Sequence, residues 1–222
     1  MAGKLIVLEG QDGSGKKTQV EKLPNRLRDA GRSFQTIAFP RYGQPSARII
    51  EKYLNGELGP VDSISPFEAS TYYANDRLDA APLIKSWLNT SDFVVADRYT
   101  ASNAAHQGAK IKDANERQRF LQWLNWFEFE VLKNIKPTMN IILGVPAEVS
   151  FEAVQKRAVK ENRKLDEHEK LFEHIKTAAA VYQELTELHP DEYKLIDCME
   201  SGQWLSPDVI HEKVWSIISP LL

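Results

Sequence analysis

Five short apolar segments recur along the chain, and longer segments with helical periodicity separate them. The apolar segments are residues 5–8, 36–39, 93–96, 139–145 and 193–196. The helical patterns include residues 16–31, 66–88, 115–133 and 167–188. Continuous apolar strands that alternate with helices are typical of a mainly parallel sheet with helices on both faces. We therefore expect an α/β fold that binds its ligands at the edge where the strands end.

The first apolar segment runs directly into a glycine-rich sequence that precedes a helical pattern. Glycines let the backbone turn tightly, so that its N–H groups point at an anion, and the helix start adds the positive end of its dipole. The Lys16 ammonium can reach the outer phosphates of a nucleotide. An ordinary strand-to-helix turn is the alternative, but the position between a strand and a helix favours a phosphate-binding loop. Its expected members are Gly10, Gln11, Asp12, Gly13, Ser14, Gly15, Lys16, Lys17 and Thr18.

Lys17 departs from the usual phosphate-loop pattern. The residue after the loop lysine is normally Ser or Thr, whose hydroxyl binds Mg²⁺, whereas this chain has a second lysine there. An ammonium group only donates hydrogen bonds and has the wrong charge for a metal ligand. We expect Lys17 to neutralise phosphate charge beside Lys16; a side chain in solvent is the alternative. The Thr18 hydroxyl could replace the missing one only in a shifted register.

The composition predicts one domain over residues 1–222. The formal net charge is −3, which gives no sign of a basic surface for nucleic acid polymers. Cys198 is the only cysteine, so an internal disulfide is impossible, and we expect its thiol to be buried. No apolar run approaches membrane-spanning length, and the first strand leaves no room for a signal peptide. These features predict a soluble, cytoplasmic protein with no nucleic acid or membrane partner.

Polar side chains follow the second and third apolar segments, at the sheet edge where the glycine-rich loop is expected. Residues 39–42 read Phe-Pro-Arg-Tyr, and Arg41 could hold the phosphate of an acceptor. Asp97 ends the third segment, where a carboxylate can manage Mg²⁺ or an acceptor oxygen. These positions predict a phosphate acceptor beside the loop.

Two helical segments offer groups for a nucleobase. Tyr73 and Arg77 are four residues apart and so share a helix face. They could present a ring to a base and a guanidinium to a phosphate, although a core tyrosine beside a surface arginine is the alternative. Further polar groups suited to a base edge belong to Ser102, Asn103, His106 and Gln107. For the histidine among them, a hydrogen-bonded helix residue is an equally open interpretation.

A basic stretch at residues 157–164 contains Arg157 and Arg163. It is either a solvated helix face or a lid that brings arginines onto transferring phosphates. Beyond it, Asp166 and Glu169 are three residues apart and share a helix face, where a solvated charge pair is the simpler interpretation.

Taken in order, five of these segments resemble the thymidylate kinase family. They are residues 9–19, 39–42, 75–77 and 97–102, and the arginine-rich segment before Asp166. Residues 39–44 and 97–105 are most similar to the actinobacterial branch, which also has a basic residue where Lys17 stands. The resemblance implies a P-loop nucleoside monophosphate kinase fold: a five-stranded parallel sheet flanked by helices, with a short lid at residues 157–166.

The resemblance also implies the reaction. The γ-phosphoryl group of ATP would pass to dTMP, giving dTDP and ADP, with Mg²⁺ as cofactor and a homodimer as the assembly. The alternatives are a kinase for another nucleoside monophosphate or a deoxynucleoside, and a nucleotide-binding regulator without turnover. Aromatic residues that could form the dimer interface, or equally the core, are Trp123, Trp126, Phe127 and Phe129.

By the same resemblance, acceptor-binding roles fall on particular residues. Asp12 would contact the 3′-hydroxyl, Tyr73 would stack on thymine, and Arg77 and Asn103 would hydrogen-bond to the base. Arg41 and Arg98 would hold the acceptor phosphate. The other expected substrate-binding residues are Phe39, Tyr42, Ser102, His106 and Gln107. His106 stands where the actinobacterial branch has a tyrosine that screens against ribonucleotides, which leaves rejection of a 2′-hydroxyl open.

Catalytic and metal-binding roles follow in the same way. Asp97, with Glu169 nearby, would organise Mg²⁺, and Tyr42 would help to position it. The family places its main catalytic arginine in the phosphate loop or in the lid. Residues 11–14 are not basic, so the lid arginines are the candidates. The expected catalytic residues are Lys16, Lys17, Asp97, Arg98, Arg157 and Arg163.

Overall fold

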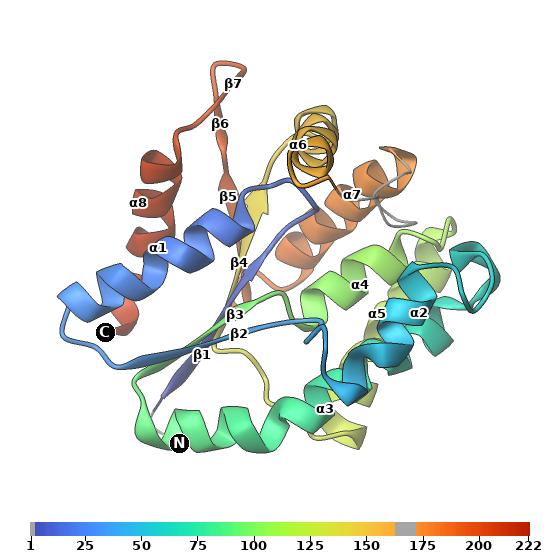
Figure 1. Cartoon of the computed structure of the whole chain (residues 1–222), viewed down its shortest axis with the longest axis horizontal. Helices are drawn as coiled ribbons and strands as arrows, with labels where there is room; N and C mark the ends of the chain where they lie inside the picture. Colours follow the sequence, from blue (N-terminus) through green and yellow to red (C-terminus); the bar gives the residue numbers. More distant parts are fainter. Residues whose placement is uncertain (1–2, 163–171) are drawn as a thin grey trace.

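Five parallel strands form the central sheet in the computed structural model, which describes residues 3–162 and 172–222 (Figure 1). The five apolar segments of the sequence are these strands, so the expected α/β fold with a five-stranded parallel sheet is confirmed. Their order is β2-β3-β1-β4-β5, and every neighbouring pair is parallel. The strands are β1 (Lys4–Glu9), β2 (Phe34–Ala38), β3 (Phe93–Asp97), β4 (Met139–Gly144) and β5 (Tyr193–Asp197).

Helices cover both faces of this sheet. They are α1 (Lys16–Asp29) and α8 (Pro207–Ile218) on one face, and α3 (Pro66–Thr90), α4 (Thr100–Gly108) and α7 (Phe172–Leu188) on the other (Figure 1). On β1, Ile6 and Leu8 pack with α1 and α8, whereas Leu5 and Val7 pack with α3. Burial on both faces explains why the strands read as continuous apolar runs.

The remaining helices are shorter or lie at the periphery. They are α2 (Arg48–Leu54), α5 (Ala114–Trp126) and α6 (Ala147–Lys160), with 3₁₀ turns at Pro45–Ala47, Val61–Ser63 and Ser219–Leu221. The helix expected over residues 115–133 is α5 followed by a π-helical turn at Phe127–Val131. This wider turn is associated with a fully buried carboxylate, that of Glu128.

The four aromatic residues of this region divide between the core and the surface. Phe129 packs with the α3 core, and Trp123 packs beside α4, α5 and α7. The Trp123 ring stacks on Phe127 with centroids 5.1 Å apart. Trp126 is 54% exposed, which leaves it available for an interface.

A small antiparallel hairpin follows β5 and was not expected from the sequence. Its strands are β6 (Met199–Glu200) and β7 (Gln203–Trp204). The two residues between them, Ser201 and Gly202, have φ values of 49° and 77°, which a tight hairpin turn requires. Cys198, just before β6, is buried as expected. Within the part of the chain that the structure describes, no helix has the length and apolar composition to cross a membrane.

Candidate active site

The glycine-rich loop connects β1 to α1 at the switch point of the sheet, because β1 has β3 on one side and β4 on the other. Gly13 has a φ of 82°, and a Cβ built on it would lie 2.3 Å from the Ser150 carbonyl oxygen. Only glycine therefore allows α6 to pack this closely on the loop. The Gln11 side chain donates to Ser150 Oγ at 3.1 Å and to the carbonyl of Val145. These bonds tie the loop to α6 and to the end of β4.

The Lys16 ammonium is folded back onto its own loop. Its Nζ donates to the carbonyl oxygens of Gly10 and Gln11 at 2.8 and 2.9 Å. Burial, with the Arg98 guanidinium nearby, lowers the pKa of Lys16 to about 8. A phosphate would therefore have to compete with two carbonyls for this cation. Lys17 and Thr18, the next two residues, are exposed.

Arg98 links the glycine-rich loop to the end of β3. Its guanidinium forms an ion pair with Asp12 and donates to Ser102 Oγ at 3.0 Å and the Gly10 carbonyl at 3.3 Å. Burial alone would raise the pKa of Asp12, but the charges of Arg98 and Lys16 hold it well below its usual range. The backbone at Arg98 is left-handed, with a φ of 66°.

Glu9 is a buried anchor that had no predicted role. Its carboxylate accepts hydrogen bonds from the backbone N–H groups of Tyr99 and Ser102, at 2.8 and 3.2 Å. It also accepts from the hydroxyls of Ser102 and Tyr182, at 2.6 and 3.0 Å. An acidic group at the start of α4 caps that helix and complements its dipole. The signal in the sequence was a carboxylate directly after the apolar run of residues 5–8.

One pocket collects most of the residues expected to bind an acceptor. It lies between the loop, the segment after β2, α3 and the start of α4. Of the expected substrate-binding residues, it is lined by Asp12, Phe39, Tyr42, Tyr73, Arg77, Arg98, Ser102, Asn103 and His106. We refer to this cavity as the acceptor pocket.

Arg41 and Gln107 are expected substrate residues that do not line the acceptor pocket. Arg41 donates from Nε to Asp76 at 2.9 Å and from Nη2 to Ser46 at 2.8 Å, and it also pairs with Asp79. Gln107 is buried, and its Oε1 accepts from the Tyr53 hydroxyl at 3.4 Å.

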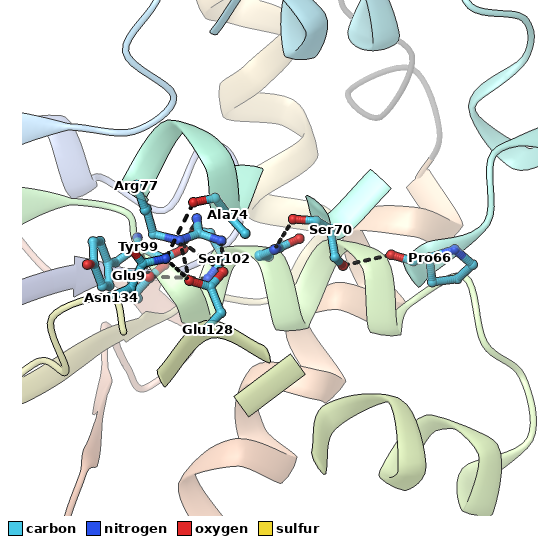
Figure 2. Close-up of polar contacts among 10 residues, drawn as sticks. Glu9, Pro66, Ser70, Ala74, Arg77, Tyr99, Ser102, Glu128 and Asn134 are labelled. Atoms are coloured by element: carbon cyan, nitrogen blue, oxygen red, sulfur yellow. Dashed lines mark hydrogen bonds and ion pairs between the residues drawn. The ribbon is translucent and has the colours of Figure 1, made fainter. Parts of the chain in front are cut away.

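Arg77 is held in the wall of the acceptor pocket by a buried ion pair (Figure 2). Its Nε donates to both carboxylate oxygens of Glu128 at 3.1 and 3.2 Å, and Nη2 makes a further short contact. Asn134 donates to the same carboxylate at 2.7 Å. Burial opposes the charge of Arg77, but Glu128 raises the pKa of the guanidinium above its usual value.

The side-chain amide of Asn103 has its nitrogen committed to the fold and its oxygen unused. Its Nδ2 donates to the Ser70 carbonyl at 3.2 Å. Its Oδ1 is buried with no hydrogen-bond partner among the described residues. An unpaired buried acceptor is costly unless a ligand satisfies it, so this oxygen is suited to a donor on a bound base.

A second pocket lies over the glycine-rich loop and the first turn of α1. Its lining includes Lys17, Arg157 on α6 and Asp97. Asp12 and Arg98 line both pockets, so the two cavities meet at this ion pair. The full set from the glycine-rich loop is Asp12, Gly13, Gly15, Lys16, Lys17 and Thr18. We refer to this cavity as the donor pocket.

The hairpin β6–β7 reaches the same end of the loop. A ring carbon of Trp204 lies 3.8 Å from the position that a Cβ on Gly15 would occupy, and the side chain is 39% exposed. Residues 157–160 of the expected lid continue α6. Arg163, Asp166 and Glu169 lie outside the described residues.

Three comparisons with known proteins point in one direction. A family model described as Thymidylate kinase matches residues 8–206. A thymidylate kinase from Mycobacterium tuberculosis is 40% identical over 183 residues, covering 82% of this chain and 85% of that protein. A probable thymidylate kinase from Thermococcus kodakarensis is 30% identical, with 98% of each chain covered. The solved structure of thymidylate kinase from Candida albicans has a TM-score of 0.72 and 24% identity, covering 99% of this chain and 92% of that chain, and it shares the fold.

Proposed function

The chain belongs to the thymidylate kinase family, and from that premise we propose how its two pockets carry out the reaction. It is a phosphotransferase that passes the γ-phosphoryl group of ATP to dTMP, giving dTDP and ADP. The similarity to the actinobacterial branch is confirmed by the Mycobacterium tuberculosis relative. The observation that carries the assignment of substrates to pockets is that Asp12 and Arg98 line both cavities. Donor and acceptor phosphates would meet at that junction.

The acceptor pocket would hold dTMP. The Tyr73 ring would stack on thymine, and the unused Oδ1 of Asn103 would accept from the ring N–H of the base. Arg77, fixed by Glu128, would donate to a base carbonyl. At the other end, Asp12 would contact the sugar hydroxyl and Arg98 the phosphate. Because Arg41 is engaged by Asp76 and Asp79, its part would be to support this wall rather than to bind the phosphate directly.

The donor pocket would hold the triphosphate of ATP. The loop amides and the start of α1 supply a positive field, and Lys16 would exchange its two carbonyl partners for phosphate oxygens. Lys17 and Arg157 line the same cavity, so their charges would neutralise the transferring group. Little covalent chemistry falls to the protein, which places donor and acceptor in line and stabilises spread negative charge.

Asp97 fits a role in holding Mg²⁺. Its Oδ1 is buried and has no hydrogen-bond partner within the described residues, and it lies in the donor pocket wall. The described residues contain no group of three or more metal-ligating side chains, so phosphate oxygens and water would complete the coordination. When bound, the ion would neutralise charge on the β- and γ-phosphates. Glu169, the second expected ligand, stays a prediction.

The assembly and location of the enzyme are also proposals. We infer a homodimer with Trp126 in its interface, because this large apolar side chain is left exposed while its three aromatic neighbours are packed. A cytoplasmic location accords with the buried single thiol and with the nucleotide substrates.

A coupled assay of ADP release tests the substrate assignment. The free enzyme is assayed with ATP, Mg²⁺ and each of dTMP, dUMP, CMP, UMP, AMP and GMP. We expect the highest kcat/KM for dTMP, because the Tyr73, Arg77 and Asn103 set matches a pyrimidine with a hydrogen-bonding edge. A comparable kcat/KM for CMP or AMP would contradict the assignment, and no turnover with any acceptor would favour a nucleotide-binding regulator.

A further inference from the structure

Two histidines from different helices form a stacked pair beside the junction of the pockets. His106 lies on α4 and lines the acceptor pocket, and His174 lies on α7. Their ring centroids are 5.4 Å apart with an interplanar angle of 24°. Nδ1 of His106 lies 3.2 Å from Nε2 of His174, and Nε2 of His106 lies 3.3 Å from Nη1 of Arg98. His174 had no predicted role.

The arginine fixes the direction of both hydrogen bonds. A guanidinium can only donate, so Nε2 of His106 must be the acceptor. The His106 proton is then on Nδ1, which donates to Nε2 of His174. Because that nitrogen accepts, the proton of His174 is on its own Nδ1. Each ring is thus neutral and in the Nδ1–H form as long as the chain of hydrogen bonds persists.

We propose, on the premise of the function above, that His174 is a positioning residue for phosphoryl transfer. By accepting from His106, it keeps that ring neutral, so that Nε2 of His106 accepts from Arg98. This bond helps to aim the Arg98 guanidinium, which also pairs with Asp12, at the place where the two pockets meet. His174 acts through His106 and does not itself line either pocket.

The surroundings of His174 favour its neutral form. Burial lowers the pKa of His174 to about 4, and the Lys110 ammonium, two residues after α4, acts in the same direction. The carboxylates of Asp12 in the glycine-rich loop and Asp62 in the nearby 3₁₀ turn act against it. An imidazole without such surroundings is half protonated near pH 6.5. A protonated His106 would place a second positive charge against Arg98 and would lose its acceptor.

Nitrogen-15 NMR of the histidine rings tests the tautomers without any substrate. In the free wild-type enzyme we expect the Nδ1–H form for both rings, persisting from pH 8 down to about pH 5. In His174→Phe, which keeps an aromatic ring but has no acceptor, we expect the Nδ1–H form of His106 to be lost at a higher pH than in the wild type. An Nε2–H form of His106 in the wild type at pH 7 would overturn the proposal.

Steady-state kinetics test the consequence for turnover. His174→Phe should lower kcat/KM for dTMP by about tenfold at pH 6, the size of effect expected from one lost hydrogen bond to a charged group, with a smaller loss at pH 8. His174→Gln, whose side-chain oxygen can accept from His106, should restore most of the activity at pH 6. His189→Phe is the matched control, because this histidine lies beyond the other end of the same helix and packs on Tyr193.

The possible outcomes distinguish failure of the positioning role of His174 from failure of the proposed function. A pH profile of His174→Phe that superimposes on the wild type, with an unchanged melting temperature, would overturn the positioning role. Equal losses at every pH in His174→Phe and His174→Gln would also overturn it, since only packing would then matter. If the wild type did not phosphorylate dTMP, the function would fail, whereas the NMR result would still decide the tautomers.

Discussion

At the residue scale, the site depends on Arg98, a non-glycine residue with left-handed backbone. That conformation costs about 1 kcal/mol for an ordinary residue. Its side chain contacts Asp12, Ser102 and the Gly10 carbonyl, which joins the end of β3 to the glycine-rich loop and to α4. Burial alone would lower the pKa of Arg98, but Asp12 and Asp97 are among the groups that raise it above its usual value. The charge at the junction is therefore permanent.

Loss of the Lys16 proton should give the pH profile of kcat/KM for ATP a falling alkaline limb. Its pKa is lowered to about 8, so the ammonium is present below that pH and is lost as the pH rises through it. We expect kcat/KM for ATP to fall above about pH 8, because this parameter reports ionisation in the free enzyme. Lys16→Arg, which stays charged, should be less active but should lack the limb. A flat wild-type profile from pH 6.5 to 9.5 would contradict the assignment.

The lowered pKa of Lys16 also makes the free energy of unfolding depend on pH. Between the folded value of about 8 and the unfolded value of 10.5, the unfolded chain binds more protons at Lys16 than the folded chain. The contribution of this group to the free energy of unfolding therefore rises with pH across that window.

Lys17 should affect turnover more than ATP binding. Its side chain is exposed and lines the donor pocket, where it can reach phosphate but cannot bind Mg²⁺. We expect Lys17→Ala to lower kcat about tenfold, the effect of losing ~1.4 kcal/mol in the transition state, with a smaller change in KM for ATP. Lys17→Ser should not restore it fully. Lys22→Ala, on the same helix but paired with Asp208, is the control. Full activity and an unchanged Mg²⁺ requirement in Lys17→Ala would mean that the Lys17 side chain points into solvent and takes no part in the reaction.

At the element scale, the π-helical turn after α5 contains Glu128, which forms the buried ion pair with Arg77. Asn134 supports the same carboxylate, so three segments converge where α3 passes this turn (Figure 2). A buried ion pair contributes little over an apolar pair, but removing one partner leaves a charge without compensation.

Glu128→Gln should therefore unfold more easily. We expect the free energy of unfolding to fall by about 3 kcal/mol, because a buried guanidinium loses its counter-charge. Affinity for dTMP should fall as well, since Arg77 lines the acceptor pocket. Denaturant titration and acceptor binding measure the two effects. Glu130→Gln is the matched control, because Glu130 lies in the same turn but its partner Lys133 is exposed. Equal stability of the two variants would refute the argument.

What could be predicted from the sequence follows from what sequence patterns encode. The strands were predictable because burial on both faces leaves continuous apolar runs, as on β1. The role of Glu128 was not predictable, because it is 51 residues from Arg77 and the helical period does not mark a π turn. The ion pairs of Arg41 were not predictable for a related reason: its partners Asp76 and Asp79 lie on α3, a contact visible only in the fold, and its role toward the acceptor phosphate stays a prediction.

The site residues followed the same rule. The glycine-rich loop has a local backbone requirement, visible at Gly13, so its position could be read from spacing. The resemblance supplied Asn103 and Tyr73, which line the expected pocket. His174 and Glu9 act through other residues rather than through a ligand, and no local pattern signals that.

At the scale of the whole molecule, one domain over residues 1–222 and a homodimer stay predictions. We expect light scattering to give twice the mass of one chain, and Trp126→Glu to give a monomer, because a charge would be buried at the interface. Val159→Glu, at another exposed apolar residue, on α6, should leave the assembly unchanged. A monomeric wild type would rule out the proposed interface.

The position of Trp204 beside the glycine-rich loop has an optical consequence. The other four tryptophans belong to α3, α5 and α8, whereas Trp204 lies beside Gly15, at the entrance to α1. A half-exposed indole changes its emission when a charged ligand displaces the water around it, and a nucleotide in the donor pocket would do so here. We therefore expect ATP to change the fluorescence of Trp204, which lies beside Gly15 in the donor pocket wall, whereas dTMP alone should leave it unchanged and Trp204→Phe should abolish the response.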